Sequence, residues 1–152
     1  MDNTWAGWQS CLVAVTDWRQ MLSADDGYAL RPGAAPGEVA AAETALAAVF
    51  PAELRQLYLA SDGVFDRPGQ WFTIWPLSQV VTRNRETWPQ HGPGRRELVG
   101  FGDDGTGAPF CVPRDGSSGV FAWSPITGEA TRLASSMSGF WSGWTAGTLP
   151  PH

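Results

Sequence analysis

Lysine is absent from this chain of 152 residues, and all ten of its cationic side chains belong to arginine. Fifteen Asp and Glu residues outnumber them, so the formal net charge is −5. Non-specific binding to DNA or RNA needs a basic surface. The charge balance therefore argues against nucleic acid as a partner.

Long apolar stretches are also missing. No run approaches the roughly eighteen consecutive apolar residues that a transmembrane helix requires. The first residues, MDNTWAGWQS, lack the basic region with which a signal peptide begins. We therefore expect a cytoplasmic protein that does not use a membrane as its partner.

Cysteine and histidine are scarce, which limits the chemistry available. Cys11 and Cys111 lie far apart without metal-ligand spacing, so we expect two free thiols, with one disulfide as the alternative. His91 and His152 are the two histidines. A histidine-rich metal site is excluded, and catalysis by a Ser/His/Asp or Cys/His set would have to use His91. We expect neither a metal nor a cofactor.

Aromatic residues are abundant, with nine Trp and seven Phe, and 43% of all residues are hydrophobic. A chain of this length and composition can bury a core and is not disordered. We detect no internal repeat and no low-complexity run. The sequence therefore predicts one domain that covers residues 1–152.

Three amphipathic stretches in the first half predict helices. The first covers residues 4–22, with Thr4 as its N-cap, and the second covers residues 36–48. The third begins at Pro51 and ends before Gly63, a residue that can adopt the left-handed conformation that stops a helix.

Glu43 lies on the apolar stripe of the second predicted helix, four residues after Val39 and three before Leu46. A carboxyl group in such a place can be a catalytic acid with a raised pKa. More often it accepts hydrogen bonds from backbone amides at the start of the next helix, here near residues 52–54. We therefore assign Glu43 a structural role, together with Pro51, Gly63 and the turn residue Gly105.

The second half changes from a helical period to the alternation of strands. Strands are predicted over residues 71–75, 98–101, 109–112, 119–123 and 130–133, with Asp-Gly turns between several of them. A short helix is expected over residues 78–86, a loop over 91–96, and a C-terminal helix after Ser135 or Ser136 that carries Met137, Phe140, Trp141 and Trp144. Runs of helices and strands, rather than alternation, indicate an α+β fold. We expect a largely antiparallel sheet with the N-terminal helices and the C-terminal helix packed on it.

The ordered combination of these segments resembles the SUKH superfamily. The match begins at the helix that carries Glu43 and continues with Phe50-Pro51, where the family usually has Leu-Pro. Asp62-Gly63 stands where Asn-Gly is common. The remaining matching segments are the strand 71–75, Pro76-Leu77, residues 98–105, 110–112 and 119–123, and the closing helix around Phe140.

This resemblance covers about residues 36–144 and implies a protein that works by binding. The superfamily contains fungal cell-wall-synthesis regulators and bacterial immunity proteins that bind and inactivate a cognate toxin, often a nuclease or a deaminase. The implied partner is such a protein toxin. The implied molecule is a monomer or weak dimer and not an enzyme.

The strand 71–75 is apolar on both faces, because Phe72 and Ile74 alternate with Trp71, Thr73 and Trp75. Either the second face is covered, by the N-terminal helix or by Trp141 and Trp144, or part of the set Trp71, Trp75 and Trp123 stays exposed as an aromatic patch for a partner. We expect some of this set to be accessible.

Acidic residues gather in the predicted loops: Asp62, Asp66, Asp103, Asp104 and Asp115. Asp before Gly favours tight turns, which explains most of these positions. The functional alternative is a negative rim that faces a basic toxin. The residues assigned to partner binding are Trp71, Trp75, Asp66, Asp103 and Asp104.

Two enzyme-like alternatives and one scaffold alternative stay open. A hydrolase could pair Asp103 and Asp104 with Glu43 or Asp62. A small anion site could form from His91 with Arg83, Arg85, Arg95 and Arg96. A regulatory scaffold, like the fungal members that the resemblance brings in, is the third possibility.

Overall fold

The structure is a computed structural model that describes residues 16–152. Most of the predicted N-terminal helix, including Trp5 and Trp8, and also Cys11, lie outside this range. Within it the chain forms five helices and one sheet of seven strands, which confirms the predicted α+β class.

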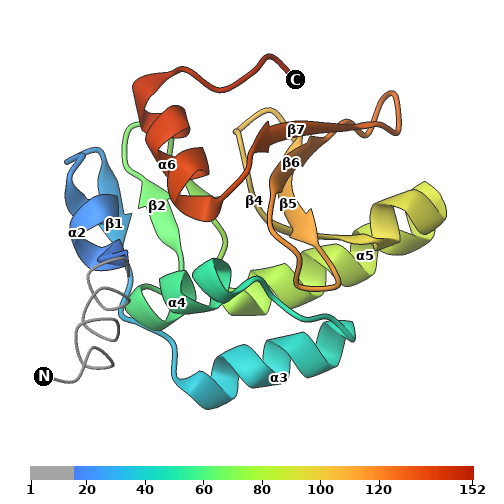
Figure 1. Ribbon diagram of the computed structural model, residues 1–152, viewed down its shortest axis with the longest axis horizontal. Helices are drawn as coiled ribbons and strands as arrows, with labels where there is room; N and C mark the ends of the chain where they lie inside the picture. The colour runs from blue at the N-terminus through green and yellow to red at the C-terminus, as the bar shows by residue number, and fades with distance from the viewer. Residues whose placement is uncertain (1–15) are drawn as a thin grey trace, which may run out of the picture.

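The sheet is antiparallel throughout, and its strands follow one another in chain order (Figure 1). The strands are β1 (Tyr28–Leu30), β2 (Val64–Asp66), β3 (Trp71–Ile74), β4 (Leu98–Asp103), β5 (Pro109–Pro113), β6 (Val120–Trp123) and β7 (Ala130–Ala134). The last five correspond to the predicted strands. The sequence did not predict β1 and β2, because three residues are too few to show an alternating pattern.

The helices are α2 (Trp18–Ser23), α3 (Pro36–Leu46), α4 (Ala52–Ala60), α5 (Leu77–Arg96) and α6 (Met137–Ala146). Residues 16 and 17 are not helical, and the Asp17 carboxylate caps α2 by accepting a hydrogen bond from the Gln20 N–H. The predicted helix 4–22 is therefore wrong as one continuous element. None of the described helices is long and apolar enough to cross a bilayer.

Helix α5 is the largest departure from the predicted elements. The predicted loop over residues 91–96 is wrong, because helical structure continues to Arg96 across Pro89 and Pro93. Gly92 has a φ of 77° and is the one non-helical residue inside the element, so two helical segments meet there at a kink. Proline suits the first turn of a helix, and Pro93 directly follows this break.

One face of the sheet packs against α6. Phe101 on β4 and Phe110 on β5 contact Phe140 on α6, with ring centroids 5.6 and 4.7 Å apart. Ser136 caps α6 by accepting a hydrogen bond from the Gly139 N–H. Trp144 continues the contact, because its ring lies 5.4 Å from that of Phe110.

The opposite face is covered by α5, which crosses behind β4 and β5 in Figure 1. The Arg83 guanidinium lies 4.8 Å from the centre of the Trp75 ring, and the His91 ring meets Trp123 edge-on at 6.4 Å. The expectation that Trp141 and Trp144 cover this face is wrong, since both belong to α6 on the other side. Of these two covering residues, Arg83 belongs to the predicted helix 78–86, whereas His91 belongs to the segment that the sequence placed in a loop.

Glu43 joins α3 to the start of α4. Its Oε2 accepts hydrogen bonds from the Phe50 N–H at 2.8 Å and from Arg55 Nη2 at 3.1 Å. Pro51 is the N-cap of α4 rather than its first residue. The backbone amide that Glu43 binds thus belongs to Phe50, just before the expected residues 52–54.

We predict that Glu43→Ala lowers the free energy of unfolding by about 2 kcal/mol, because the buried Phe50 N–H loses its acceptor. Glu43→Gln keeps an acceptor oxygen and loses only the charge, so we expect a loss of about 1 kcal/mol. Urea unfolding measures both. The control is Glu129→Ala at an exposed position, and an equal effect there would contradict the structural role of Glu43.

Candidate functional site

Trp71 is half-buried at the edge where the β2–β3 and β4–β5 turns meet. Its ring lies against two turn glycines. A Cβ at Gly69 would be 1.7 Å from the ring, and one at Gly105 would be 3.2 Å away. The indole Nε1 donates to the Asp103 carbonyl at 3.3 Å. The ring is therefore held in one orientation while part of it stays accessible.

Three carboxylates belong to the two turns whose glycines lie against this ring, and each accepts hydrogen bonds from its own turn. Asp66 accepts from the Gly69 N–H at 2.8 Å, and Asp103 accepts from the Gly105 N–H at 2.7 Å. Asp104 accepts from the Thr106 N–H at 2.9 Å and the Thr106 hydroxyl at 2.6 Å. The turn explanation therefore holds for all three. We call the set Asp66, Trp71, Asp103 and Asp104 the Trp71 edge.

The two neighbouring carboxylates of the Trp71 edge are well covered, with side chains 16% exposed for Asp103 and 13% for Asp104. His152 lies 2.9 Å from Asp104 Oδ2. Burial raises the pKa of the Asp104 carboxyl, but the hydrogen bonds from Thr106 and His152 outweigh it and hold this pKa below its ordinary value. Asp104 therefore stays ionised at neutral pH.

Trp75 and Trp123 are buried, at 4% and 5% exposure. Neither can be an exposed aromatic anchor, so the expected patch is reduced to Trp71. Trp75 instead holds the Asp103 carboxylate in place, because its Nε1 donates a hydrogen bond to Asp103 Oδ2 at 3.0 Å. Its carbonyl accepts a hydrogen bond from the Tyr58 hydroxyl at 2.7 Å, which ties β3 to α4.

A buried polar network under α5 was missed by the sequence analysis. Asn84 donates to the Gly100 carbonyl and accepts from the Gly100 N–H, both at 2.8 Å. The same Oδ1 accepts from Arg95 Nη2 at 3.1 Å, and Arg95 Nη1 donates to the Leu98 carbonyl at 2.9 Å. The available signal was Asn84 itself, one polar residue on the apolar stripe formed with Val80 and Trp88.

Gly100 makes room for this network. A Cβ at this position would lie 3.0 Å from Arg95 Nη2 and 3.3 Å from the Trp75 ring. Glycine therefore lets helix α5, strand β4 and the buried guanidinium approach one another closely.

The four arginines proposed for an anion site do not gather. Arg85 donates to the Ala45 carbonyl, and Arg96 stacks on Trp88. Arg83 and Arg95 do meet His91 at a cavity of about 240 Å³ between α5 and the sheet. Two of the four arginines thus share one site with the histidine.

The proposed hydrolase pairs are not brought together. Glu43 is engaged at the start of α4, and Asp62 accepts a hydrogen bond from the Leu77 N–H at 2.8 Å, at the start of α5. Neither lines the cavity that Asp103 lines. Each carboxylate therefore serves a helix start rather than a shared reaction site.

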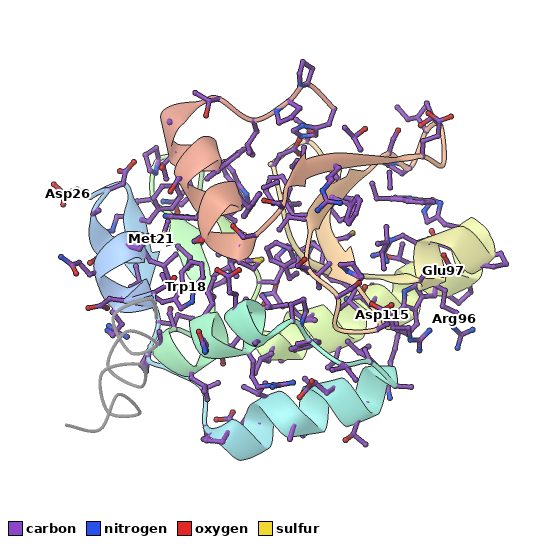
Figure 2. The ribbon with its side chains drawn as sticks, in the orientation of Figure 1. Trp18, Met21, Asp26, Arg96, Glu97 and Asp115 are labelled. Carbon is purple, nitrogen blue, oxygen red and sulfur yellow. The ribbon has the colours of Figure 1, made fainter. Side chains whose placement is uncertain are left out.

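A larger hollow lies away from the Trp71 edge, with a volume of about 830 Å³. Glu97 and Asp115, labelled in Figure 2, line it from the end of α5 and from the β5–β6 turn. Phe121 and the exposed Val49 provide its apolar part. It contains none of the residues that the sequence assigned to partner binding.

We predict that Asn84→Leu lowers the free energy of unfolding by about 3 kcal/mol or more, because the Gly100 amide, the Gly100 carbonyl and Arg95 Nη2 all lose a partner in the interior. Gln79→Leu on the same helix replaces an amide that makes no such contacts, and should change stability by less than about 0.5 kcal/mol. Urea unfolding of both variants tests this. Equal stabilities would contradict the role of Asn84.

Cys111 is a free, buried thiol on the face that α5 covers. Burial raises its pKa to about 11, against a smaller opposing effect of Arg95. We predict that in a Cys11→Ser variant it reacts with a disulfide reagent at pH 8 at least about a hundredfold more slowly when folded than in urea. Because the folded pKa is raised, this contribution to stability is present below about pH 8.5 and declines as the pH rises towards 11. Rapid labelling of the folded chain would contradict the burial.

Comparison with protein families matches residues 33–143 to the SMI1 / KNR4 family (SUKH-1). A search of curated proteins finds no match. The matched span begins just before α3, ends within α6 and includes the whole Trp71 edge and the Asn84–Arg95–Gly100 network. It covers well over half of the chain and agrees with the resemblance drawn from the residues. The chain belongs to the SMI1 / KNR4 (SUKH-1) family.

Proposed function

We propose that this protein is a non-enzymatic binding module that neutralises a cognate protein toxin, and that the Trp71 edge forms part of its docking surface. Membership of the SUKH-1 family supports a binding role in general terms. The observation that carries the proposal is the accessible Trp71 ring, fixed between Gly69 and Gly105.

A fixed tryptophan is well suited to anchoring a partner. Tryptophan is enriched among the residues that contribute most to protein interfaces. Ordering a side chain on binding costs free energy, and a ring that is already held in place avoids much of that cost. The bond from Trp71 Nε1 to the Asp103 carbonyl limits the ring further.

The charge at this edge favours a basic partner. Asp66, Asp103 and Asp104 belong to the two turns that the ring contacts, and the chain as a whole carries −5. Hydrogen bonds from turn amides hold these carboxylates in fixed orientations. Toxins that cleave nucleic acids are generally cationic, so complementary charge would speed association and select the partner.

The alternatives have less support. A hydrolase with paired carboxylates would need Glu43 or Asp62 beside Asp103, and both are engaged at helix starts. A regulatory scaffold would also work by binding, and no contact described above favours it specifically.

The test is binding to any toxin domain that proves to be encoded beside this gene, measured by calorimetry, together with rescue of cells that express the toxin. We predict that Trp71→Ala weakens binding about tenfold or more. Phe121→Ala is the matched control, because it removes another half-buried aromatic ring at the distant hollow. Loss of binding with Phe121→Ala but not with Trp71→Ala would move the docking surface to that hollow.

The electrostatic part has its own variants. Asn can replace Asp as an acceptor in such turns, so Asp66→Asn combined with Asp103→Asn removes charge while keeping the turns. We expect slower association and a weaker dependence on salt. Binding that ignores both salt and these substitutions would contradict the charged edge, and failure of rescue with every neighbouring toxin would overturn the function.

A further inference from the structure

The cavity of about 240 Å³ between α5 and the sheet has a buried floor and an exposed mouth. Trp75, Arg95 and Trp123 are buried and line its floor, whereas Arg83 and Glu86 are exposed at the mouth. The sequence analysis considered an anion site here but with four arginines. The structure retains a smaller set of donors that no family match assigns.

Two of the residues that line this cavity each carry a buried donor that has no hydrogen-bond partner within the described chain. These donors are the Nε of Arg95, a residue only 1% exposed, and the indole Nε1 of Trp123. A buried N–H without an acceptor costs roughly 1–3 kcal/mol. Donors of this kind are rare in folded proteins, and two of them on one cavity indicate a place for an acceptor.

Arg95 also carries a charge that the described residues do not neutralise. Its two terminal nitrogens bind neutral oxygens, on Asn84 and on Leu98, and it forms no ion pair within residues 16–152. A buried charge without a counter-ion is strongly unfavourable. An anion in the cavity would supply that counter-ion.

Four other charged or titratable residues line the cavity, namely Arg83, Glu86, His91 and Asp103. Asp103 is engaged by Gly105 through one oxygen, and by Trp75 and, at 4.0 Å, Arg83 through the other. Arg83 adds positive charge, and Glu86 at the mouth opposes an anion. The deepest charged group is therefore Arg95, which makes the floor favourable for negative charge.

We propose that this cavity binds a carboxylate group, with Arg95 Nε and Trp123 Nε1 as donors to its oxygens. Each donor offers one N–H, which suits the two oxygens of a planar carboxylate better than the several oxygens of phosphate. This inference does not rest on the toxin-binding proposal, because its test uses small acids and no partner protein.

The test is titration of the intact protein with sodium acetate at constant ionic strength, with sodium chloride and inorganic phosphate as comparison probes. The resonances of the Trp123 indole N–H and the Arg95 Nε–H are followed by NMR. We expect both to shift with one common millimolar half-saturation, since so small a ligand binds weakly. Equal shifts with chloride, a stronger response to phosphate, or no shift would overturn the proposal.

Substitutions separate the site from general effects. Trp123→Phe keeps an aromatic ring but removes the pyrrole part with its N–H, so acetate affinity read at Arg95 should fall about tenfold. Trp88→Phe is the matched control, because its Nε1 is also buried and unpaired but lies outside this cavity. Glu86→Gln should raise the affinity by removing a like charge. Unchanged affinity in Trp123→Phe would overturn the assignment of its donor.

The carboxylate can come from a free acid or from the side chain of another polypeptide. Titration with the capped peptide Ac-Gly-Glu-Gly-NH2 distinguishes these sources. Acetate binding without peptide binding supports a small free acid, whereas comparable peptide binding supports insertion of a partner's acidic side chain. Binding of neither probe overturns the site altogether.

Discussion

The paired hydrogen bonds between the Asn84 side chain and the Gly100 backbone hold this structure together where the sheet would otherwise be incomplete. Strand β3 ends at Ile74, and Pro76 then starts α5, so no strand continues beside Gly100. The amide of Asn84 takes the place of that neighbour by offering one donor and one acceptor. A buried peptide group would otherwise be unsatisfied in the middle of the molecule.

This constraint positions both surfaces discussed above. By fixing α5 on β4, Asn84 places Arg95 under the cavity and Arg83 over Trp75. Trp75 in turn bonds to Asp103, whose carbonyl accepts from Trp71. The Trp71 edge and the cavity therefore share Asp103. The absence of a side chain at Gly100 allows this close packing.

Much of the fold follows from local signals, and the failures have identifiable causes. The Asp-Gly turns were predictable, and Gly105 and Gly116 have the positive φ that such turns require. The helical end of α5 was not predictable. Its prolines and glycines indicate a loop, whereas tertiary contacts with Trp123 and β4 keep it helical. Burial of Trp123 was hidden for the same reason, since His91 in that missed segment lies against its ring. The turn carboxylates and Trp71 could be identified, whereas Arg95 was named only among four arginines, because nothing in the sequence marked it as the buried one.

The connections of the sheet also bear on how the chain reaches this state. The strands from β4 to β7 are joined by short turns, whereas α3 and α4 intervene between β1 and β2, and α5 intervenes between β3 and β4. Closing a short loop costs less chain entropy than closing a long one. We therefore expect the β4–β7 meander to assemble early, with the β3–β4 pairing and the docking of α5 as the slow step of folding.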